Sequence, residues 1–334
     1  MIKFAIIGCG LIGQKRAKAL AALTSDATLV ACVDINIDRA QQCASVFPNC
    51  FVFDNYKTML EKTNPDVVII ATTHELLSKI GEQIILIGKH VFFEKPAGRN
   101  ANEINKLISA LKGKNNIVHV GFNHRYHPAL QQAKKLINDN VIGDLMYIRA
   151  RYGHGGRLGY EKEWRAKPEL SGGGELIDQG VHLIDLSRWI LGEFVEMNGY
   201  AHNYYWNMPV EDNAFLTLKT AKKQVAFLHV SCTEWKNLFS FEIFGKTGKL
   251  HVNGLGGSYG TETLTHYKML PEMGPPEIFN YEYPSGDQSW ELELADFIEN
   301  IKHHRSSSPN LHDAFEALTI VEKIYKQSGI NYHE

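Results

Sequence analysis

An acid and an imidazole lie four residues apart in a mostly apolar part of this 334-residue chain. They are Asp178 and His182, within the segment from Ser171 to Asp185. If that segment is helical, the two side chains project from one face, with Asp185 next along it. Apolar neighbours would bury the pair in part, so each group would influence the protonation of the other. A histidine placed in this way is suited to transfer a hydroxyl proton near neutral pH.

Three other interpretations of Asp178 and His182 stay open from their spacing. The histidine can be a core residue whose hydrogen bond is satisfied by the aspartate, or the two can form an ion pair on a helix surface. They can also be two ligands of a metal ion, but a third ligand at a clear spacing is missing. No metal is therefore predicted, and acid–base chemistry is one of several uses of the pair.

A lysine, Lys95, lies between Glu94 and Pro96, directly after the apolar run from His90 to Phe93. That run predicts a parallel strand, and the carboxyl ends of parallel strands are where such sheets bind ligands. Pro96 fixes its own φ and biases Lys95 toward an extended backbone, so the lysine would be held in place. Taken alone, a Lys-Pro pair is more often a surface turn than a functional site.

A glycine-rich turn at Gly8, Gly10 and Gly13 follows the first apolar run and opens an amphipathic segment. In a nucleotide-binding βαβ unit, the first glycine permits the tight turn and the second lets the backbone approach a pyrophosphate. The third lets the helix pack on the strand, and the amides at the helix N-terminus bind the phosphates. Asp34 ends the next apolar run about 20 residues later, where such a unit has an acid for the ribose. Together these features predict a dinucleotide site.

The side chain of Asp34 favours NAD over NADP. Its carboxylate can accept hydrogen bonds from both ribose hydroxyls, whereas a 2′-phosphate there would meet a like charge. Arg39 lies one helical turn further on and can reach a phosphate, so NADP is the less favoured alternative. A glycine turn in a doubly wound domain that binds no dinucleotide is the remaining interpretation.

These residues need a framework of alternating strands and helices, and the first 121 residues have that pattern. Five apolar runs are typical of buried parallel strands: Lys3 to Ile7, Thr28 to Val33, Val67 to Ala71, His90 to Phe93, and Ile117 to Val120. Four segments between them have helical spacing: Leu11 to Leu23, Asp38 to Val46, Leu76 to Ile87, and Ala101 to Leu111. The pattern predicts an α/β fold with an N-terminal Rossmann domain, residues 1–121, built on a parallel sheet.

Beyond residue 121 the strands follow one another directly. They are predicted at Met146 to Arg151, Asn213 to Lys219, Gln224 to Glu234, Ser240 to Phe244, and Leu250 to Val252. Two helices, Trp290 to Ile301 and Leu311 to Lys326, follow them. This succession predicts an α+β domain over residues 122–334, with a mainly antiparallel open sheet for substrate binding and oligomerisation. The C-terminal helix can pack back on the Rossmann domain.

Composition excludes several classes of protein. Lys and Arg (35) nearly balance Asp and Glu (37), which predicts no nucleic-acid partner. No apolar run approaches the roughly 20 residues of a membrane span, and no secretory signal is recognisable at the N-terminus. The five cysteines show no CxxC spacing, so free thiols in a reducing, cytoplasmic setting are predicted.

Three motifs occur in a fixed order along nearly the whole chain: GxGxxG with Asp34, then Glu94-Lys95-Pro96, then GGGxLxDxGxHxxD beginning at Gly172. In this combination the sequence resembles the Gfo/Idh/MocA oxidoreductases, the family of glucose-fructose oxidoreductase and inositol dehydrogenase. The resemblance implies that His182 is the general acid/base. It also implies that Lys95 polarises the reacting hydroxyl or carbonyl, and that Asp178 orients the substrate and the histidine.

The match to the family has two gaps. Where the family often has Thr-Pro and a later histidine, this chain has Thr72, Thr73 and His74, which can still line the nicotinamide side. Where many relatives have an Arg-Arg pair, it has Asn123 and, two residues on, Arg125 as a pocket candidate. The residues expected to bind the cofactor are Gly8, Gly10, Leu11, Ile12, Gly13, Asp34, Arg39, Thr72, Thr73, His74, Glu94 and Lys95.

Polar and aromatic clusters outside these motifs give hints about the substrate. Aromatic faces beside amides and charges suit a sugar, and Arg157 and Arg165 can hold a phosphate or carboxylate. A nucleotide-activated or acidic sugar is therefore one expectation, although loop packing and subunit contacts would explain any one of these residues equally well. The residues expected to bind substrate are Lys95, Asn123, Arg125, His154, Arg157, Trp164, Asp178 and His182.

The leading hypothesis is an NAD-dependent oxidoreductase that acts on a hydroxyl or keto group of a sugar. One alternative is an NAD-dependent glycosidase of the same fold, and another is a non-catalytic NAD-binding sensor. The resemblance also implies a homodimer or homotetramer that associates through the open face of the C-terminal sheet.

Overall fold

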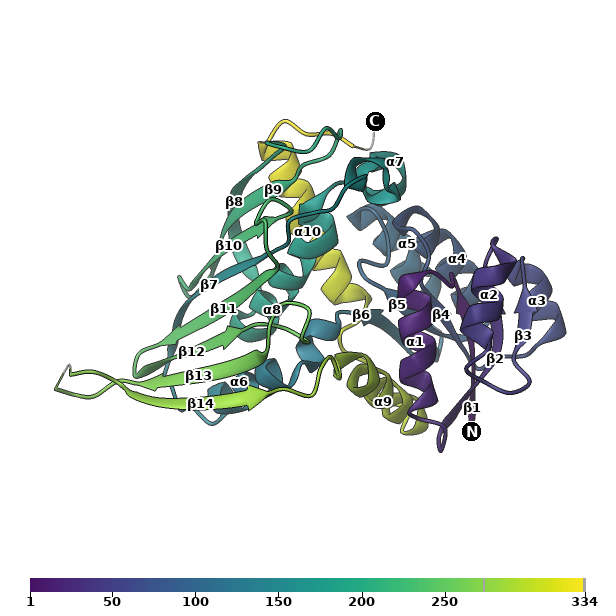
Figure 1. Ribbon diagram of the computed structural model, residues 1–334, viewed down its shortest axis with the longest axis horizontal. Helices are drawn as coiled ribbons and strands as arrows, with labels where there is room; N and C mark the ends of the chain where they lie inside the picture. The colour runs from purple at the N-terminus through teal and green to yellow at the C-terminus, as the bar shows by residue number, and fades with distance from the viewer. Residues whose placement is uncertain (273, 333–334) are drawn as a thin grey trace. The chain divides into compact units, whose positions relative to one another are not determined.

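The computed structural model describes residues 1–272 and 274–332, and the chain divides into two compact units (Figure 1). The first unit contains Met1–Phe122 and Trp290–Glu316, and the second contains Asn123–Ser289 and the chain from Ala317 onward. The sequence places the boundary one residue earlier, after 121, and assigns everything beyond it to one domain. Within the described residues, no helix has both the length and the apolar character needed to cross a membrane.

A six-stranded parallel sheet forms the centre of the first unit. Its strands are β1 (Ile2–Ile7), β2 (Ala27–Val33), β3 (Phe51–Phe53), β4 (Val67–Ile70), β5 (His90–Glu94) and β6 (Val118–Gly121), in the order β3-β2-β1-β4-β5-β6. Its helices are α1 (Leu11–Ala21), α2 (Ile37–Ala44), α3 (Tyr56–Lys62), α4 (His74–Leu86), α5 (Ala101–Leu111) and α9 (Ser289–Lys302), with the start of α10 (Leu311–Gln327). This strand order is that of a Rossmann fold, which confirms the predicted fold of the domain.

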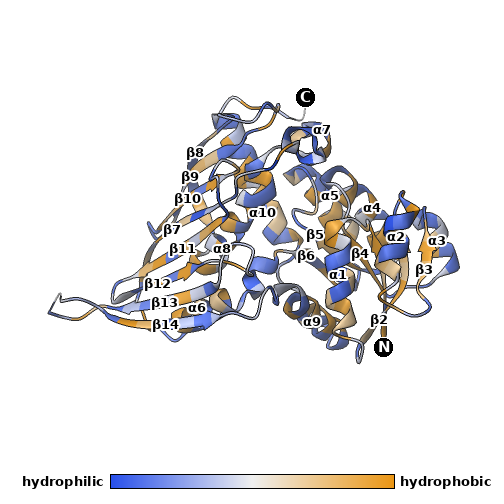
Figure 2. Ribbon diagram, in the orientation of Figure 1, coloured by the Kyte–Doolittle hydropathy of each residue, from blue (hydrophilic) through white to orange (hydrophobic). Residues whose placement is uncertain are grey.

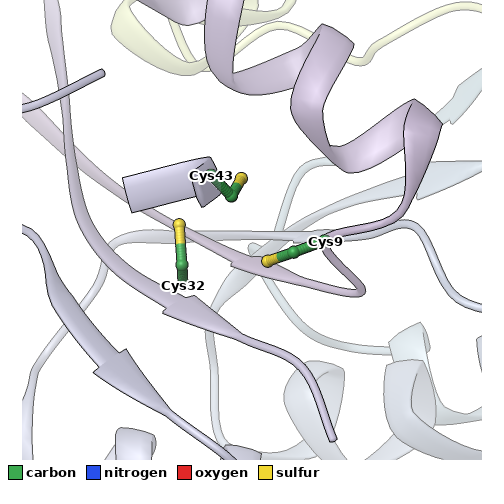
Figure 3. A group of neighbouring side chains, drawn as sticks. All are labelled: Cys9, Cys32 and Cys43. Atoms are coloured by element: carbon green, nitrogen blue, oxygen red, sulfur yellow. The ribbon is translucent and has the colours of Figure 1, made fainter. Parts of the chain in front are cut away.

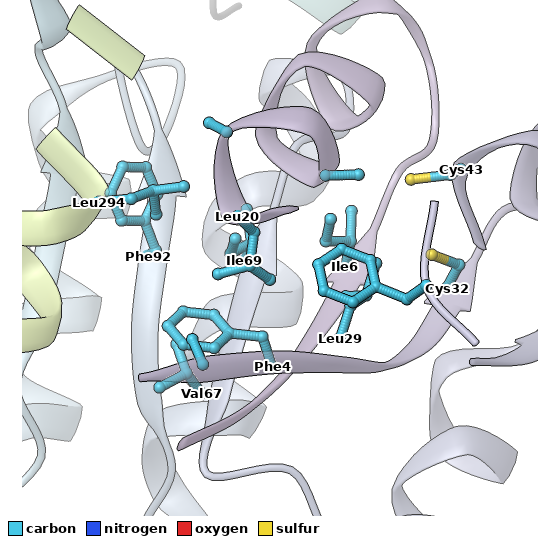
Figure 4. Packing of buried hydrophobic residues seen from close by; sticks show 14 of the residues in the cluster. Phe4, Ile6, Leu20, Leu29, Cys32, Cys43, Val67, Ile69, Phe92 and Leu294 are labelled. Carbon is cyan, nitrogen blue, oxygen red and sulfur yellow. The ribbon is translucent and has the colours of Figure 1, made fainter. Parts of the chain in front are cut away.

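Apart from the short edge strand β3, the strands of this sheet are largely buried because helices cover them, as their apolar sequences predict. Figure 2 shows these strands mainly in the hydrophobic colour. Phe4 and Val67 pack beneath Leu20 of α1, while Phe92 of β5 contacts Leu294 of α9 (Figure 4). A helix some 200 positions later in the sequence thus completes the core of the N-terminal unit.

An eight-stranded sheet forms the second unit. Its strands are β7 (Leu145–Gly153), β8 (Phe194–His202), β9 (Asn213–Thr220), β10 (Val225–Ser231), β11 (Leu238–Gly245), β12 (Gly248–Asn253), β13 (Glu262–Lys268) and β14 (Glu277–Tyr283). Their order is β14-β13-β12-β11-β7-β10-β9-β8. Neighbouring strands pair antiparallel, except that β7 and β10 run parallel. The predicted mainly antiparallel sheet is therefore confirmed.

The helical segments of the second unit that precede β8 lie before β7 or between β7 and β8. They are η1 (Asn123–Tyr126), α6 (Pro128–Asn138), η2 (Tyr160–Lys162), η3 (Trp164–Ala166), α7 (Pro168–Ser171), η4 (Leu176–Gly180) and α8 (Val181–Leu191). Helix α8 is almost entirely buried, including its polar residues Asp185 and Ser187. The apolar residues of β10, such as Leu228, face inward, whereas Phe227 on the same strand is exposed.

Arg16, on α1, is a charged side chain without solvent exposure. Its Nε donates to Glu94 Oε1 at 2.6 Å, and its Nη1 lies 2.7 Å from Glu293 Oε2. The guanidinium also stacks over the ring of Phe92, 4.3 Å from its centroid. Burial raises the pKa of Glu94, and the neighbouring Arg16 opposes that rise. The guanidinium thus ties α1, β5 and α9 together by charge.

Replacing Arg16 by methionine should destabilise the first unit strongly. Glu94 and Glu293 would remain buried without their cation, and breaking a buried pair in this way costs about 3–5 kcal/mol. The control is Lys302→Met in the same unit, whose pair with Asp26 is solvent-exposed, so its loss should change stability little. Urea denaturation followed by circular dichroism measures both, and equal losses would contradict the assigned role of Arg16.

Candidate active site

The glycine turn between β1 and α1 has the sterics of a nucleotide-binding turn. A Cβ on Gly13 would lie 2.0 Å from the carbonyl oxygen of Gly8, so only glycine allows the helix to pack this closely. Gly8 has a φ of 91°, and a Cβ there would lie 2.5 Å from the carbonyl oxygen of Ala71. A Cβ on Gly10 would meet nothing within 4 Å, which leaves open space over the turn. The sterics of Gly8 and Gly13 agree with the tight turn and the close helix packing expected from the sequence, and the approach of Gly10 to a pyrophosphate stays a prediction.

Helix α1 begins at Leu11, with Gly10 as its N-cap and no side chain that caps the helix. The first amides of α1 are therefore available to an anion such as a pyrophosphate. At the end of β2, Asp34 lies beside the same turn. Its Oδ2 accepts a hydrogen bond from the Cys9 amide at 2.7 Å, and its Oδ1 accepts one from the Asn36 amide at 2.9 Å. The carboxylate is thus held next to the turn, as the recognition of a ribose requires.

The other residues expected at the cofactor lie near this edge of the sheet or on α2. Thr73 is the N-cap of α4, and His74 in its first turn is buried. The backbone of Thr72 packs against Gly8, which links the end of β4 to the glycine turn. Lys95 is half-buried at the end of β5, and its bond to the next residue is cis. Arg39 is exposed on the first turn of α2.

The segment that carries Asp178 and His182 is helical, but not as one regular helix. Leu176–Gly180 forms a π-helical turn, η4, and α8 begins only at Val181. The condition of one regular helix, on which the shared face of Asp178 and His182 depended, is therefore not met at Asp178. The backbone just before the turn is closely packed, because a Cβ on Gly174 would lie 2.0 Å from the carbonyl oxygen of Glu211.

Asp178 forms an ion pair with Arg165. The Arg165 Nε donates to Asp178 Oδ2 at 2.9 Å, and Asp178 raises the pKa of Arg165. Because a guanidinium compensates this carboxylate, Arg165 orients Asp178 on the π turn. The sequence suggested Arg165 as a ligand of a substrate anion, but it did not predict this pairing.

His182 is buried and stacks on a second histidine, His124 of η1. The two ring centroids lie 3.8 Å apart, with 18° between the planes. Tyr152 of β7 approaches both rings edge-on, and burial raises its phenol pKa well above the ordinary value. His124 Nδ1 lies 3.2 Å from the side-chain oxygen of Asn123, which helps to orient the stack. Sequence reasoning missed His124, although it lies between the two predicted residues Asn123 and Arg125.

Arg125 has a structural partner within the second unit. Its Nε donates to Asp185 Oδ2 at 2.8 Å, and a second nitrogen contacts Oδ1 of the same carboxylate. Both side chains are buried, and this ion pair connects η1 to α8. Arg125 thus has a carboxylate partner of its own, and its place in the substrate pocket stays a prediction. Asn123 likewise donates to Ser289 Oγ at 2.8 Å.

The remaining predicted substrate residues lie on the loop after β7. His154 Nε2 is 3.4 Å from Glu175 Oε1; burial alone would lower its pKa, but Glu175 raises it. Arg157 is exposed and pairs with Glu163 at 2.6 Å. The ring of Trp164 lies under the Arg165 guanidinium, 4.6 Å from it. Arg157 is linked to Asp178 by successive ion pairs, because Glu163 also lies 4.0 Å from Arg165, which pairs with Asp178.

A buried carboxylate, Glu211, holds the backbone from which η4 starts. It accepts hydrogen bonds from the amides of Gly174 and Leu176, both at 2.9 Å. The phenols of Tyr325 and Tyr332 donate to the same carboxylate at 2.8 and 3.0 Å. Burial raises the pKa of Glu211 to about 6. Nothing in the local sequence signals this residue, because its partners lie more than 30 positions away.

Both parts of the chain match known protein families. Residues 2–122 match the oxidoreductase family with an NAD-binding Rossmann fold, and residues 130–251 match the Gfo/Idh/MocA C-terminal domain. The chain belongs to the Gfo/Idh/MocA oxidoreductase family. This confirms the resemblance inferred from the three sequence motifs.

Similar members of the family are dehydrogenases. Levoglucosan dehydrogenase of Pseudarthrobacter phenanthrenivorans is 27% identical, over 98% of this chain and 97% of its own length. D-glucoside 3-dehydrogenase of Escherichia coli is also 27% identical, over 61% of this chain and 58% of its own. The protein described here is accordingly an NAD-dependent dehydrogenase of the Gfo/Idh/MocA family that acts on CH–OH groups.

Solved structures share the fold over nearly the whole chain. A levoglucosan dehydrogenase in complex with NADH and levoglucosan has a TM-score of 0.88 and 23% identity, covering 98% of this chain and 97% of its own. The WlbA dehydrogenase from Bordetella pertussis, in complex with NADH and UDP-GlcNAcA, has a TM-score of 0.83 and 20% identity, covering 98% and 96%. At these identities the likeness establishes the fold.

Glu211→Gln should destabilise the second unit and disturb η4. A glutamine offers one acceptor oxygen, and its amide hydrogens would face donors, so about 1–3 kcal/mol should be lost at pH 7. The pKa of Glu211 is raised from 4.5 to about 6 in the folded state, so between these pH values the folded protein binds more protons than the unfolded chain. The free energy of unfolding therefore falls as pH rises through that interval. The variant should lack this part of the pH dependence.

Thermal unfolding of wild type and Glu211→Gln at pH 5 and pH 7 measures both effects. Glu196→Gln is the matched control, since its pair with Lys219 is exposed and should change stability by less than about 1 kcal/mol. A Glu211→Gln protein as stable as the control at pH 7 would show that the carboxylate does not hold the turn.

Proposed function

We propose that this dehydrogenase oxidises a ring hydroxyl of a sugar, or reduces the corresponding ketone, with His182 transferring the hydroxyl proton. The observation that carries the proposal is the buried stack of His182 on His124, one turn from the ion-paired Asp178. A buried, oriented imidazole is the usual group for a hydroxyl proton near neutral pH. The names of the relatives, which are dehydrogenases of levoglucosan, a D-glucoside and inositol, support a sugar.

Each proposed residue has a defined task in this reaction. NAD, held by the glycine turn and Asp34, would supply the acceptor for the hydride of the carbon that carries the hydroxyl. A ring nitrogen of His182 takes the hydroxyl proton, so that the alcohol becomes a carbonyl. From the resemblance to the family, the Lys95 ammonium would donate a hydrogen bond to the reacting oxygen and stabilise the negative charge that develops on it. Asp178, held by Arg165, orients the substrate.

The charges around Asp178 favour a neutral sugar. Arg165 is paired with Asp178, and Arg157 is paired with Glu163, so both guanidiniums already have carboxylate partners. A substrate anion would have to displace these partners, whereas a neutral sugar can use the carboxylates as acceptors and the ring of Trp164 as a stacking face. The acidic or nucleotide-activated sugar expected from the sequence is the second candidate. Because the similar WlbA dehydrogenase was solved in complex with UDP-GlcNAcA, such sugars are included in the substrate panel below.

Two alternatives of other classes make different predictions. An NAD-dependent glycosidase would cleave an aryl glycoside without net formation of NADH. A sensor would bind NAD and turn over no sugar, and it would not need Lys95, Asp178 and His182 together.

We also expect a homodimer or homotetramer. The face of the eight-stranded sheet that carries Phe227 also exposes Tyr147 of β7, and the two strands are adjacent. An exposed apolar patch on a sheet is typical of a subunit interface.

A panel of neutral, acidic and nucleotide-linked sugars, each with NAD and read as NADH absorbance, tests the proposal. One neutral sugar should reduce NAD, and His182→Ala should lower that turnover by about 10² or more while NADH affinity stays within a factor of two. His202→Ala, an exposed histidine of the same unit, is the control and should leave turnover unchanged. Bound NAD without turnover on the whole panel, or full activity of His182→Ala, would refute the proposal.

Asp34→Ser tests the cofactor preference separately. The variant should bind NAD about tenfold more weakly, and the ratio of its affinities for NAD and NADP should fall. The reason is that the negative charge facing a 2′-phosphate is gone. Fluorescence titrations with NADH and NADPH measure both affinities, and Asp38→Ser on the exposed side of α2 serves as the control. If the ratio of the two affinities is unchanged, Asp34 does not determine the preference for NAD over NADP.

A further inference from the structure

Three buried thiols converge beneath the glycine turn of the first unit. Cys9 lies in the turn, Cys32 in β2 and Cys43 in the last turn of α2, and at most 1% of each residue is exposed. Their sulfur atoms all lie within 4.8 Å of one another. Figure 3 shows the three side chains around one small space between α2 and the sheet.

A fourth thiol lies at the margin of this group. Cys50, just before β3, has its sulfur 3.9 Å from that of Cys32, and it is half-buried. The fifth cysteine, Cys232, belongs to the second unit, and all five are free. Four of the five cysteines are thus gathered at one place, although they are spread over more than 40 positions of sequence.

The spacing of the three sulfur atoms fits a shared metal ion. Thiolates bound about 2.3 Å from one zinc ion lie about 4 Å from one another. Each sulfur pair here would have to close by less than about 1 Å, which small rotations of the side chains supply. A donor set made only of sulfur selects soft ions and disfavours hard ones such as magnesium or calcium.

The same group is satisfied in another way when it carries its protons. The thiol of Cys9 donates to the Val33 carbonyl at 3.5 Å, and that of Cys43 donates to the Gly13 carbonyl at 3.7 Å. A metal ion that binds the three sulfur atoms must therefore displace the protons of these thiols, and its positive charge offsets the thiolate charges that Asp34 would otherwise disfavour.

We propose that Cys9, Cys32 and Cys43 form a binding site for a soft divalent metal ion of the zinc and cadmium group, with Cys50 at its entrance. One ion enters, three S–H bonds break, three metal–sulfur bonds form, and three protons leave to the solvent. No oxidation state changes. This site is separate from the proposed catalytic residues and does not depend on the identity of the sugar.

The site is linked to the dinucleotide turn by its position. Cys9 stands between Gly8 and Gly10, and its amide donates to Asp34. An ion that draws the Cys9 sulfur toward Cys32 therefore acts on the turn that approaches the pyrophosphate. Thermodynamic linkage makes this effect reciprocal. If the ion changes the affinity for NAD by a given factor, NAD changes the affinity for the ion by the same factor.

The competing explanation is that these cysteines only fill the apolar core, in which free cysteine is common. The two explanations differ in a titration of the full-length, reduced, metal-free protein with cadmium chloride. The ultraviolet thiolate-to-cadmium charge-transfer absorption and the cadmium retained after desalting should both reach one ion per chain. Absence of bound cadmium in the wild-type protein would overturn the proposal without the need for any variant.

Single variants assign the ligands. Cys32→Ala and Cys43→Ala should each weaken cadmium binding at least about tenfold, whereas Cys232→Ala, also buried, should leave it unchanged. Circular dichroism checks that each variant is folded. Binding that survives Cys43→Ala, or that is lost equally in Cys232→Ala, would overturn the assignment.

The linkage to the cofactor has its own measurement. NADH fluorescence titrations with and without one equivalent of cadmium should differ about fivefold or more in the wild type and agree in Cys43→Ala. Equal affinities in the wild type would refute the linkage, whatever the cadmium stoichiometry.

Discussion

The buried charge of Arg16 decides how the first unit is assembled. A guanidinium without solvent needs carboxylates close by, and the two that it finds come from β5 and from α9. Glu94 is followed directly by Lys95, so the same ion pair that closes the core also fixes the strand end that presents the lysine. Glu293 lies on a helix from the far end of the chain, and His119 of β6 contacts it at 3.1 Å. The recruitment of α9 into this unit follows from that charge balance as much as from the apolar contact of Leu294.

The second unit uses a buried anion in a comparable way. Glu211 binds two backbone amides of the glycine-rich segment, and that segment leads into the π turn and α8. In both units, then, a carboxylate away from solvent sets the backbone a few residues before a proposed catalytic side chain. Such groups are costly to bury and are stable only when fully hydrogen-bonded, so they allow one arrangement of the segment that they hold.

The sequence predicts those parts of the protein that depend on local patterns. The glycine turn, Asp34 and the apolar strands of the parallel sheet are of this kind, since each rests on neighbours within a few residues. Strands β8, β13 and β14 of the second sheet and β3 of the first were not predicted. Strand β14 is largely exposed, and β3 is only three residues long. The first domain was predicted without α9, since helical spacing shows that a helix exists and not which core it joins.

Contacts between distant residues could not be predicted, and they decide much of the candidate site. The stack of His124 on His182, the pairing of Arg165 with Asp178 and the capture of Arg125 by Asp185 each join residues 13 to 60 positions apart. The four gathered cysteines have no motif spacing for the same reason, because the order of the strands brings them together. Two of these contacts bear on the expected substrate ligands, because Arg165 and Arg125 each have a protein carboxylate as partner.

The stack of two imidazoles also bears on the direction of proton transfer. Rings 3.8 Å apart would repel each other if both were protonated, so the stack favours at most one imidazolium. Asp178 would stabilise a positive charge on His182, but Arg165 already compensates that carboxylate. A neutral imidazole is the form that accepts a proton, so oxidation of a hydroxyl by the proposed mechanism requires that His182 be the neutral ring of the pair before the reaction.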